Sequence, residues 1–276
     1  MVLWRGRPRN GRLHSAIASV IGILEWRPNY NFEISLKNGT QTHPSLVVTD
    51  KTMAAKEHDQ AYWDAYYAKR PADIAKPSSF AEWAWKFLGA RPEAERGSTL
   101  VDLGCGNGRD SEFFGDKFSV TGVDNSEAAI ESNSKVTKLV TYKFGSVAAF
   151  REVVPKVDVA YTRFVLHALP SKIQTEMLGE CAKALEAGGF LIIETRSVND
   201  PLCGDGTAVE GEENAWQSAT NRDSVSKHYR RFQSLETLTK EVESHGFEVA
   251  EAYEDAENSW HKTDHAVVVR MIARRK

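Results

Sequence analysis

The chain has few cysteines, no long apolar run and little net charge. Its three cysteines, Cys105, Cys181 and Cys203, show no paired spacing, which predicts neither disulfides nor a zinc site and fits a reducing compartment. The apolar runs are too short to span a bilayer, and the first residues lack the apolar core of a secretory signal. A net charge of −3 argues against nucleic-acid binding by bulk electrostatics. We therefore expect a soluble, cytoplasmic protein without a metal, a nucleic-acid partner or a membrane partner; its oligomeric state is not indicated.

Residues 1–52 differ from the rest of the chain. Four arginines lie within the first twelve residues, and hairpin-like stretches follow at Asn31–Leu36 and Leu46–Val48. Asn38-Gly39 between them is a turn pattern. The interpretation is a small appendage, β-rich or partly disordered, whose arginines form a solvated tail in preference to a binding surface.

The remainder, 53–276, begins with helical patterns. Residues 61–67 and 79–88 carry aromatic side chains at helical spacing, and Pro71 and Pro77 interrupt them. We expect a helical lid over about 57–90. The pattern leaves open whether its aromatic side chains form core or line a ligand site.

Strands and helices then alternate, which predicts a doubly wound, mainly parallel α/β sheet with helices on both faces. A helix from Ser171 should end at Gly188-Gly189. The last two strands are joined only by a loop and should therefore form an antiparallel pair at the sheet edge. The seven expected strands are 99–103, 118–123, 139–144, 157–161, 190–194, 247–252 and 266–272.

A long polar stretch, residues 197–232, separates the fifth strand from the last helix. Loops of this length beside a ligand site are usually lids or substrate-binding segments. The stretch ends in His228-Tyr-Arg-Arg-Phe232, and an arginine presents a rigid donor fork to carboxylate or phosphate. Successive residues point in different directions, so at most one of Arg230 and Arg231 should face a pocket. Alternatively, one of them pairs with the acidic residues at 210–213.

A glycine-rich turn follows the first strand of the alternating part. The segment Asp102-Leu-Gly-Cys-Gly-Asn-Gly108 lets the backbone approach a bulky ligand, and the helix that follows it supplies unpaired N–H groups. Asp124 lies 20 residues after Gly104, at the end of the second strand, where a carboxylate can bind ribose hydroxyls. A dinucleotide fingerprint would need G-x-G-x-x-G, but the sixth position is Arg109.

Val-Asp-Leu-Gly-Cys-Gly-Asn-Gly at 101–108 and Thr-Gly-Val-Asp-Asn-Ser at 121–126 resemble motif I and the acidic loop of class I S-adenosylmethionine (SAM)-dependent methyltransferases. The resemblance covers roughly 62–274. It implies a Rossmann-like methyltransferase fold with a seven-stranded sheet and an antiparallel C-terminal edge strand. It also implies SAM as the cofactor.

The resemblance places the methionine part of SAM against the glycine loop. Gly104, Cys105 and Gly106 would line it, and Asp102 would stabilise the loop or reach the amino group. Asp124 would hold the ribose.

The same resemblance assigns the rest of the cofactor site. Asn125 would lie beside the adenine. Ser146 stands where the family often has an acidic residue that bonds the adenine amine, so a backbone contact from Val147 is expected to remain. Thr162, in the fourth-strand motif at 158–167, would stand nearest the sulfonium.

The expected class of methyl acceptor rests on the absence of two sequence motifs and on the position of His167. No Pro-Pro-aromatic motif follows the fourth strand and no Pro-Cys pair occurs, which excludes adenine-amino and pyrimidine-C5 methylation of nucleic acids. A small-molecule acceptor remains, methylated on oxygen in preference to nitrogen. His167 is the candidate general base, with a packing role as the alternative.

A looser resemblance to a bacterial subgroup from surface-glycan and secondary-metabolite pathways is carried by Tyr62-Trp-Asp-Ala-Tyr-Tyr67, Pro77-Ser-Ser-Phe-Ala81, Asn107-Gly-Arg-Asp-Ser111 and His228-Tyr-Arg-Arg-Phe232. It favours a sugar or a phosphate- or carboxylate-bearing metabolite. Two competing functions remain, an NAD(P)-dependent oxidoreductase and a SAM-binding regulatory protein without turnover. The residues expected to bind the acceptor are Tyr66, Arg163, His167, Tyr229, Arg230 and Arg231.

Overall fold

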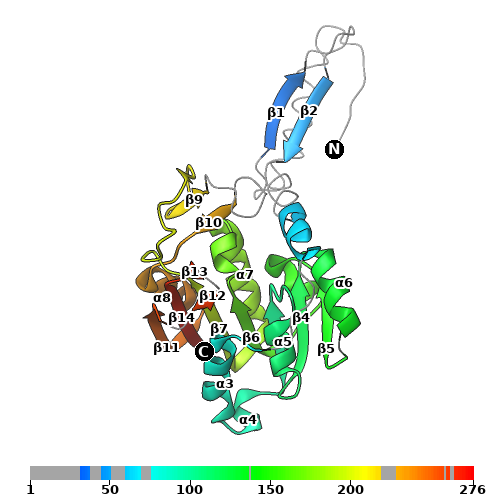
Figure 1. Cartoon of the computed structure of the whole chain (residues 1–276), viewed down its shortest axis with the longest axis vertical. Coiled ribbons are helices and arrows are strands. Elements are labelled where there is room, and N and C mark those ends of the chain that lie inside the picture. The colour runs from blue at the N-terminus through cyan, green and yellow to red at the C-terminus, as the bar shows by residue number, and fades with distance from the viewer. Residues whose placement is uncertain are drawn as a thin grey trace. The chain divides into compact units, whose positions relative to one another are not determined.

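The computed structural model describes residues 32–37, 45–50, 60–69, 76–136, 138–218, 228–257, 259–261 and 264–276. The chain divides into two compact units, Met1–Tyr62 and Trp63–Lys276. In the first unit, β1 (Phe32–Lys37) pairs antiparallel with β2 (Ser45–Asp50), in agreement with the two expected strands (Figure 1). The expected turn at 38–39 and the four arginines lie outside the described residues.

The second unit is built on a seven-stranded sheet in the order β11-β14-β7-β6-β3-β4-β5 (Figure 1). The strands β7, β6, β3, β4 and β5 pair in parallel, and β14 pairs antiparallel with both β7 and β11. This confirms the mainly parallel sheet with an antiparallel pair at its edge; β14 lies one position in, between β7 and the outermost β11. The strand bounds are β3 (Thr99–Leu103), β4 (Ser119–Asp124), β5 (Val140–Phe144), β6 (Val157–Arg163), β7 (Leu185–Arg196), β11 (Phe247–Asp255) and β14 (Val268–Arg275).

The segments 60–67 and 79–89 are helical, in agreement with the helical patterns predicted at 61–67 and 79–88. Ser78 caps the first named helix, α3, by accepting a hydrogen bond from the Ala81 N–H at 3.0 Å. The bounds are α3 (Ser79–Gly89), α4 (Glu93–Arg96), α5 (Arg109–Phe114), α6 (Glu127–Val136), α7 (Ser171–Ala184) and α8 (Leu235–Ser244), with 3₁₀ helices η1 (Val147–Glu152) and η2 (Leu166–Ala168).

Helix α7 begins at Ser171 as predicted, but it ends before the predicted glycines. Its N-cap is Pro170, and the Ser171 N–H and hydroxyl donate hydrogen bonds to the Glu212 carboxylate. It ends at Ala184 and not at the glycines, because Leu185 already pairs with Val157 in the sheet.

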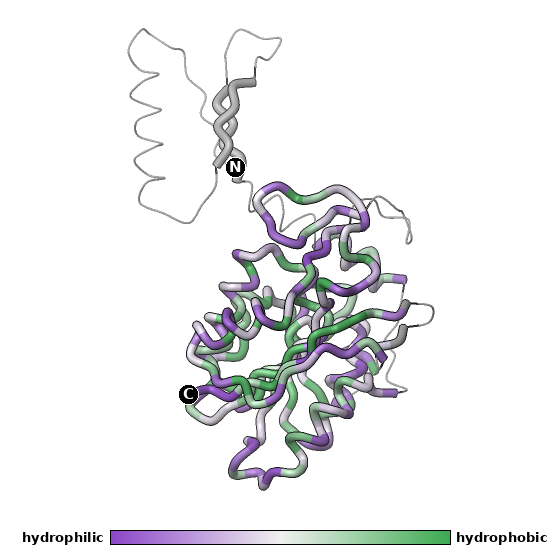
Figure 2. The backbone as a smooth tube through the Cα atoms, turned by 90° about the vertical axis from the view of Figure 1, so that its left-hand side faces the viewer, coloured by the Kyte–Doolittle hydropathy of each residue, from purple (hydrophilic) through white to green (hydrophobic). Residues whose placement is uncertain are grey.

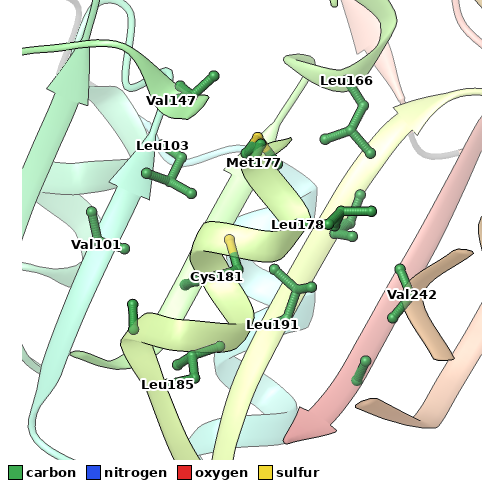
Figure 3. Packing of buried hydrophobic residues seen from close by; sticks show 14 of the residues in the cluster. Val101, Leu103, Val147, Leu166, Met177, Leu178, Cys181, Leu185, Leu191 and Val242 are labelled. Atoms are coloured by element: carbon green, nitrogen blue, oxygen red, sulfur yellow. The ribbon is translucent and has the colours of Figure 1, made fainter. Parts of the chain in front are cut away.

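The central strands direct alternate side chains into two apolar layers. Val101 and Leu103 of β3 join the layer that α7, α8 and η1 cover, whereas Leu100 joins the layer that α3 and α5 cover. Figure 2 shows the apolar segments concentrated in the middle of this unit. Figure 3 shows, in the first layer, Val101, Leu103, Val147, Leu166, Met177, Leu178, Cys181, Leu185, Leu191 and Val242.

The polar stretch 197–232 is more regular than its sequence indicates. It contains a three-stranded sheet in the order β10-β9-β8. The strands are β8 (Thr207–Ala208), β9 (Ala215–Gln217) and β10 (Tyr229–Arg231). Residues 219–227 lie outside the described residues. A second small pair, β12 (Trp260–His261) and β13 (Asp264–His265), lies between β11 and β14 in the chain. No helix in the described ranges is long and apolar enough to cross a bilayer.

Candidate cofactor and acceptor site

The glycine loop lies between β3 and α5, and its glycines are required by their conformation and surroundings. Gly104 and Gly106 have φ of +72° and +51°, a region that favours glycine. A Cβ on Gly104 would lie 2.2 Å from a Val165 methyl carbon, and one on Gly106 would lie 2.3 Å from the Tyr67 hydroxyl. Any larger residue would therefore displace the loop or its neighbours.

Asp124, at the end of β4, holds the glycine loop directly. Its carboxylate accepts hydrogen bonds from the Gly106 N–H at 2.8 Å and from the Ser126 N–H at 2.9 Å. Burial raises the pKa of this carboxyl, and the backbone hydrogen bonds oppose that shift. The Asn125 N–H is a third backbone donor to this carboxylate, and because a carboxylate accepts about four hydrogen bonds, acceptor capacity is left for a further donor.

Asp102, at the end portion of β3, is buried and accepts a hydrogen bond from the Ser111 hydroxyl at 2.6 Å. Burial raises its pKa to about 7, and the negative charges of Asp110 and Asp124 add to the effect. Ser111 belongs to α5, so the bond ties the two ends of the glycine loop together. Cys105, within the loop, is buried as well.

The expected adenine side of the site lies at the same edge of the sheet. Asn125 follows Asp124 directly, and the Gly145 N–H bonds the Asp124 carbonyl at 2.9 Å, which places Ser146 beside them. The Ser146 hydroxyl accepts from the Ala148 N–H at the start of η1, and Val147 is buried.

Thr162 of β6 is fully buried, and its hydroxyl donates to the Leu103 carbonyl at 3.1 Å. The bond joins β6 to β3 at the ends of both strands. Thr162 therefore lies close to the glycine loop, with its hydroxyl engaged in the sheet.

Residues 63–67 contact both cofactor loops. Tyr67 reaches Gly106, and Asp64 accepts a hydrogen bond from the Ser126 hydroxyl at 2.8 Å. Trp63 and Tyr66 join Tyr67 in one aromatic cluster, with ring centroids 5.1–6.0 Å apart. The aromatic pattern at 79–88, in contrast, is largely core.

The Trp63 ring also contacts the His228 ring, edge to face at 5.6 Å. It therefore connects the glycine-loop side of the site with the segment at β10. Because β10 and η2 are in contact, His228 and His167 belong to one neighbourhood.

His167 lies in η2, buried to 6% exposure, within a group of basic side chains. Burial lowers its pKa well below the usual 6.5, and Arg196, His228, Arg230 and Arg163 lower it further, in that order. Burial and the charges of Arg230 and Arg196 likewise lower the pKa of His228 to about 3. Both imidazoles are therefore neutral at pH 7, surrounded by guanidinium charge.

The two arginines of β10 differ. Successive side chains of a strand point to opposite sides, and the charge of Arg230 acts on His167 and His228, so Arg231 is expected to face the other way. Arg231 is 8% exposed, and its Nε and one terminal nitrogen lack a hydrogen-bond partner among the described residues. Tyr229 shares the side of Arg231.

Arg163, at the end of β6, belongs to a chain of buried charges. Its Nε lies 2.8 Å from a Glu194 oxygen, and the other Glu194 oxygen accepts from the Arg270 Nε at 2.8 Å. The Asp110 carboxylate lies 4.0 Å from Arg163 and accepts from the Tyr161 hydroxyl. These contacts hold Arg163 at the sheet edge where the basic group gathers.

Sequence reasoning missed Arg196 and His228. Arg196 ends β7, next to β6, so the rule that ligand-binding residues follow the carboxyl ends of parallel strands indicates it as clearly as it indicates Arg163. His228 has no comparable pattern, because only the pairing of β10 with β9 brings it to the site. No group of three or more potential metal ligands occurs in the part of the chain that the structure describes.

A model of the methyltransferase domain family matches residues 78–252. The trans-aconitate 2-methyltransferase of Variovorax paradoxus is 31% identical over 106 residues, which are 37% of this chain and 39% of the relative. The match thus spans about two fifths of that relative's length.

Two solved structures show the same fold. One is the 1,6-didemethyltoxoflavin-N1-methyltransferase of Burkholderia thailandensis, with 17% identity, 89% and 96% coverage of this chain and of the relative, and a TM-score of 0.56. The other is a SAM-dependent methyltransferase of Mesorhizobium loti, with 20% identity, 71% and 98% coverage, and a TM-score of 0.54. Because the family model matches more than half of its length, the chain belongs to the methyltransferase domain family.

Proposed function

We propose that the chain transfers a methyl group from SAM to an anionic oxygen of a small molecule, with a carboxylate as the preferred acceptor. The observation that carries the acceptor class is the charge around His167, where Arg163, Arg196 and Arg230 act on one buried ring. Arg163 and Arg196 are ion-paired with Glu194 and Asp200, but a guanidinium has five N–H donors, so pairing with one carboxylate leaves donors that favour an anion over an ammonium group. Trans-aconitate, named for the Variovorax relative, is a tricarboxylate.

The cofactor assignment rests on the geometry of the glycine loop. Gly104 and Gly106 hold the loop in a conformation that favours glycine, Asp124 has acceptor capacity left for the ribose, and Asp102 fixes the loop through Ser111. Asn125, Ser146 and Val147 would contact the adenine. When bound, SAM supplies a methyl carbon that its sulfonium has already activated.

The chain's own residues then have to bind and orient the acceptor. A carboxylate is ionised at neutral pH, so no proton has to be removed before it attacks the methyl carbon in line. His167 accordingly packs against the acceptor or forms a hydrogen bond with it in the neutral state, and it is not an obligatory base. We assign acceptor binding to four residues of the basic group, with Tyr66 at the aromatic side of the site: Arg163, Arg196, Arg230 and His167.

The acceptor class is tested with matched compounds. Purified protein is given SAM labelled on its methyl group together with trans-aconitate, a phosphate monoester, a neutral sugar and a primary amine, and transfer to each is measured. We expect transfer to the carboxylate and none to the neutral sugar or the primary amine. Transfer to the sugar or the amine alone would refute the anionic class while leaving SAM use intact.

A cytoplasmic location stays a prediction. The free state of Cys105, Cys181 and Cys203 supports it.

A further inference from the structure

Phe164 has an unusual backbone conformation next to the basic group. It follows β6 and precedes η2, with φ of +54°. Among the described residues only Asn214 shares a positive φ outside glycine, and asparagine tolerates this region far better than phenylalanine does. The Phe164 N–H still donates to the Glu194 carbonyl at 2.9 Å, so the residue is fixed against β7. Strained residues of this kind concentrate where the strain serves a binding or catalytic geometry.

The conformation places the Phe164 ring among three basic side chains. The guanidinium carbon of Arg163 lies over the ring, 4.6 Å from its centroid, and that of Arg196 lies over it at 5.4 Å. The His167 ring meets it edge-on, with centroids 5.5 Å apart and planes at 90°. An aromatic face attracts guanidinium groups, which would otherwise repel each other.

Each of the two guanidiniums also forms an ion pair with a carboxylate. Arg163 pairs with Glu194 at 2.8 Å, and Arg196 bonds Asp200 at 2.7 Å. Both carboxylates are fully buried, so their positions are fixed. The ring and the two ion pairs together set where the guanidiniums lie relative to each other.

We propose that Phe164 is a positioning residue that gathers the guanidiniums of Arg163 and Arg196 around its ring, so that together they form the receptor for the anionic group of the methyl acceptor. The inference rests on the proposed anionic acceptor class. It makes Phe164 a determinant of acceptor specificity, although the phenyl ring itself has no charge to offer an anion. A leucine there would keep much of the volume but lose the aromatic face.

The test compares Phe164→Leu with Phe164→Tyr, which keeps the face, using trans-aconitate as the probe on protein saturated with S-adenosylhomocysteine. We expect Phe164→Leu to weaken trans-aconitate binding tenfold or more, Phe164→Tyr to stay within threefold of the parent, and both to bind S-adenosylhomocysteine within twofold. Unchanged binding in Phe164→Leu, or an equal loss in Phe164→Tyr, would overturn the proposal. Should Phe164→Leu not fold, Phe164→Met takes its place, since methionine adapts to irregular space.

A second readout separates this proposal from the acceptor class. If the parent protein binds no trans-aconitate, the proposed carboxylate acceptor is wrong. The position of the guanidiniums is then tested by measuring the pKa of the His167 ring by NMR. The His167 signal is assigned by its absence from the spectrum of His167→Gln. Their departure in Phe164→Leu should move the His167 pKa upward, toward its ordinary value, whereas Phe164→Tyr should leave it in place. A His167 titration that is identical in Phe164→Leu and the parent overturns the positioning role.

Discussion

Asp124 combines two tasks at the residue scale, because the carboxylate that would bind the ribose also holds the Gly106 and Ser126 N–H groups. Replacing it with alanine should therefore weaken SAM binding by about 1.5–3 kcal/mol, or about 10- to 150-fold in Kd. Isothermal titration of the folded variant with SAM measures this directly.

Asp116→Ala is the matched control for that variant, since it removes an aspartate from an exposed position. Its Kd for SAM should equal that of the parent. Asp124→Asn keeps one acceptor oxygen and should fall between the two. A Kd that does not change in Asp124→Ala would remove the ribose assignment.

Asp102 gives a pH dependence whose sign follows from its raised pKa. An unfolded aspartate has a pKa near 3.9, whereas burial raises that of Asp102 to about 7 in the folded protein. Between these values the folded state binds more protons, so the contribution of Asp102 to stability falls as pH rises from about 4 to 7.

The comparison with Asp102→Asn isolates that contribution, because asparagine cannot ionise. Between pH 5 and pH 8 the parent should lose about 2.6 kcal/mol of unfolding free energy relative to the variant, on the scale of about 1.4 kcal/mol per pKa unit. Urea unfolding at both pH values without cofactor provides the measurement. A difference that is constant with pH would show that the carboxyl titrates normally.

The ionisation of His167 should contribute little to the pH dependence of kcat. Its lowered pKa keeps the ring neutral throughout pH 6–8, and an ionised acceptor needs no base. We expect kcat to be flat over this range and His167→Gln to lower it less than about tenfold, well below the roughly 10²–10⁴-fold that general-base catalysis contributes. An acidic limb near pH 6.5 that disappears in His167→Gln would restore the histidine as the base.

At the element scale, the alternation of side chains along β10 predicts that its two arginines differ in function. The charge of Arg230 acts on His167, so Arg230→Gln should raise the acceptor KM about 10-fold or more, with SAM affinity unchanged. Arg231→Gln is the matched control from the same strand and should leave the acceptor KM within about twofold. Steady-state kinetics with both substrates varied separates these effects, and the reverse order of the two variants would reassign the pocket side of the strand.

The elements of the sheet were the most predictable part of the chain. Short apolar segments bounded by polar turns mark buried parallel strands, and the seven predicted strands all occur, with shifted ends. The end of α7 was not predictable in this way. The glycines at 188–189 are typical helix-terminating residues, but the pairing of Leu185 with Val157 sets the end of the helix. That contact joins residues far apart in the chain, so a local pattern does not indicate it.

The candidate site was predictable only where it depends on local pattern. Asp102, Asp124 and the glycines stand in a strand–turn–helix whose chemistry the sequence displays. Arg196 and His228 depend instead on which strands become neighbours, since β7 adjoins β6 and the β10–β9 pair adjoins η2. The role of Phe164 could not be predicted, because it depends on a positive φ that a phenylalanine in the sequence does not indicate.

On the scale of the whole molecule, the site is assembled from segments far apart in the chain. Residues 63–67, the loops after β3, β4 and β6, and β10 all meet at the carboxyl ends of the parallel strands. The two apolar layers on either side of the sheet keep these strand ends in place. A ligand that bridges several of the segments should accordingly stabilise the fold as a whole.

That stabilisation distinguishes the cofactor classes. A ligand at 100 times its Kd stabilises the folded state by about 2.7 kcal/mol, which for a domain of this size raises Tm by about 5–10 °C. We expect this rise with S-adenosylhomocysteine and none with NAD or NADP, because the loop lacks the third glycine of a dinucleotide site and has Arg109 in its place. Asp124→Ala should lose most of the rise at the same ligand concentration, which ties it to the proposed ribose contact. A rise with NAD that Asp124→Ala abolishes would instead assign the glycine loop to a nicotinamide cofactor and redirect the search from methyl acceptors to hydride donors.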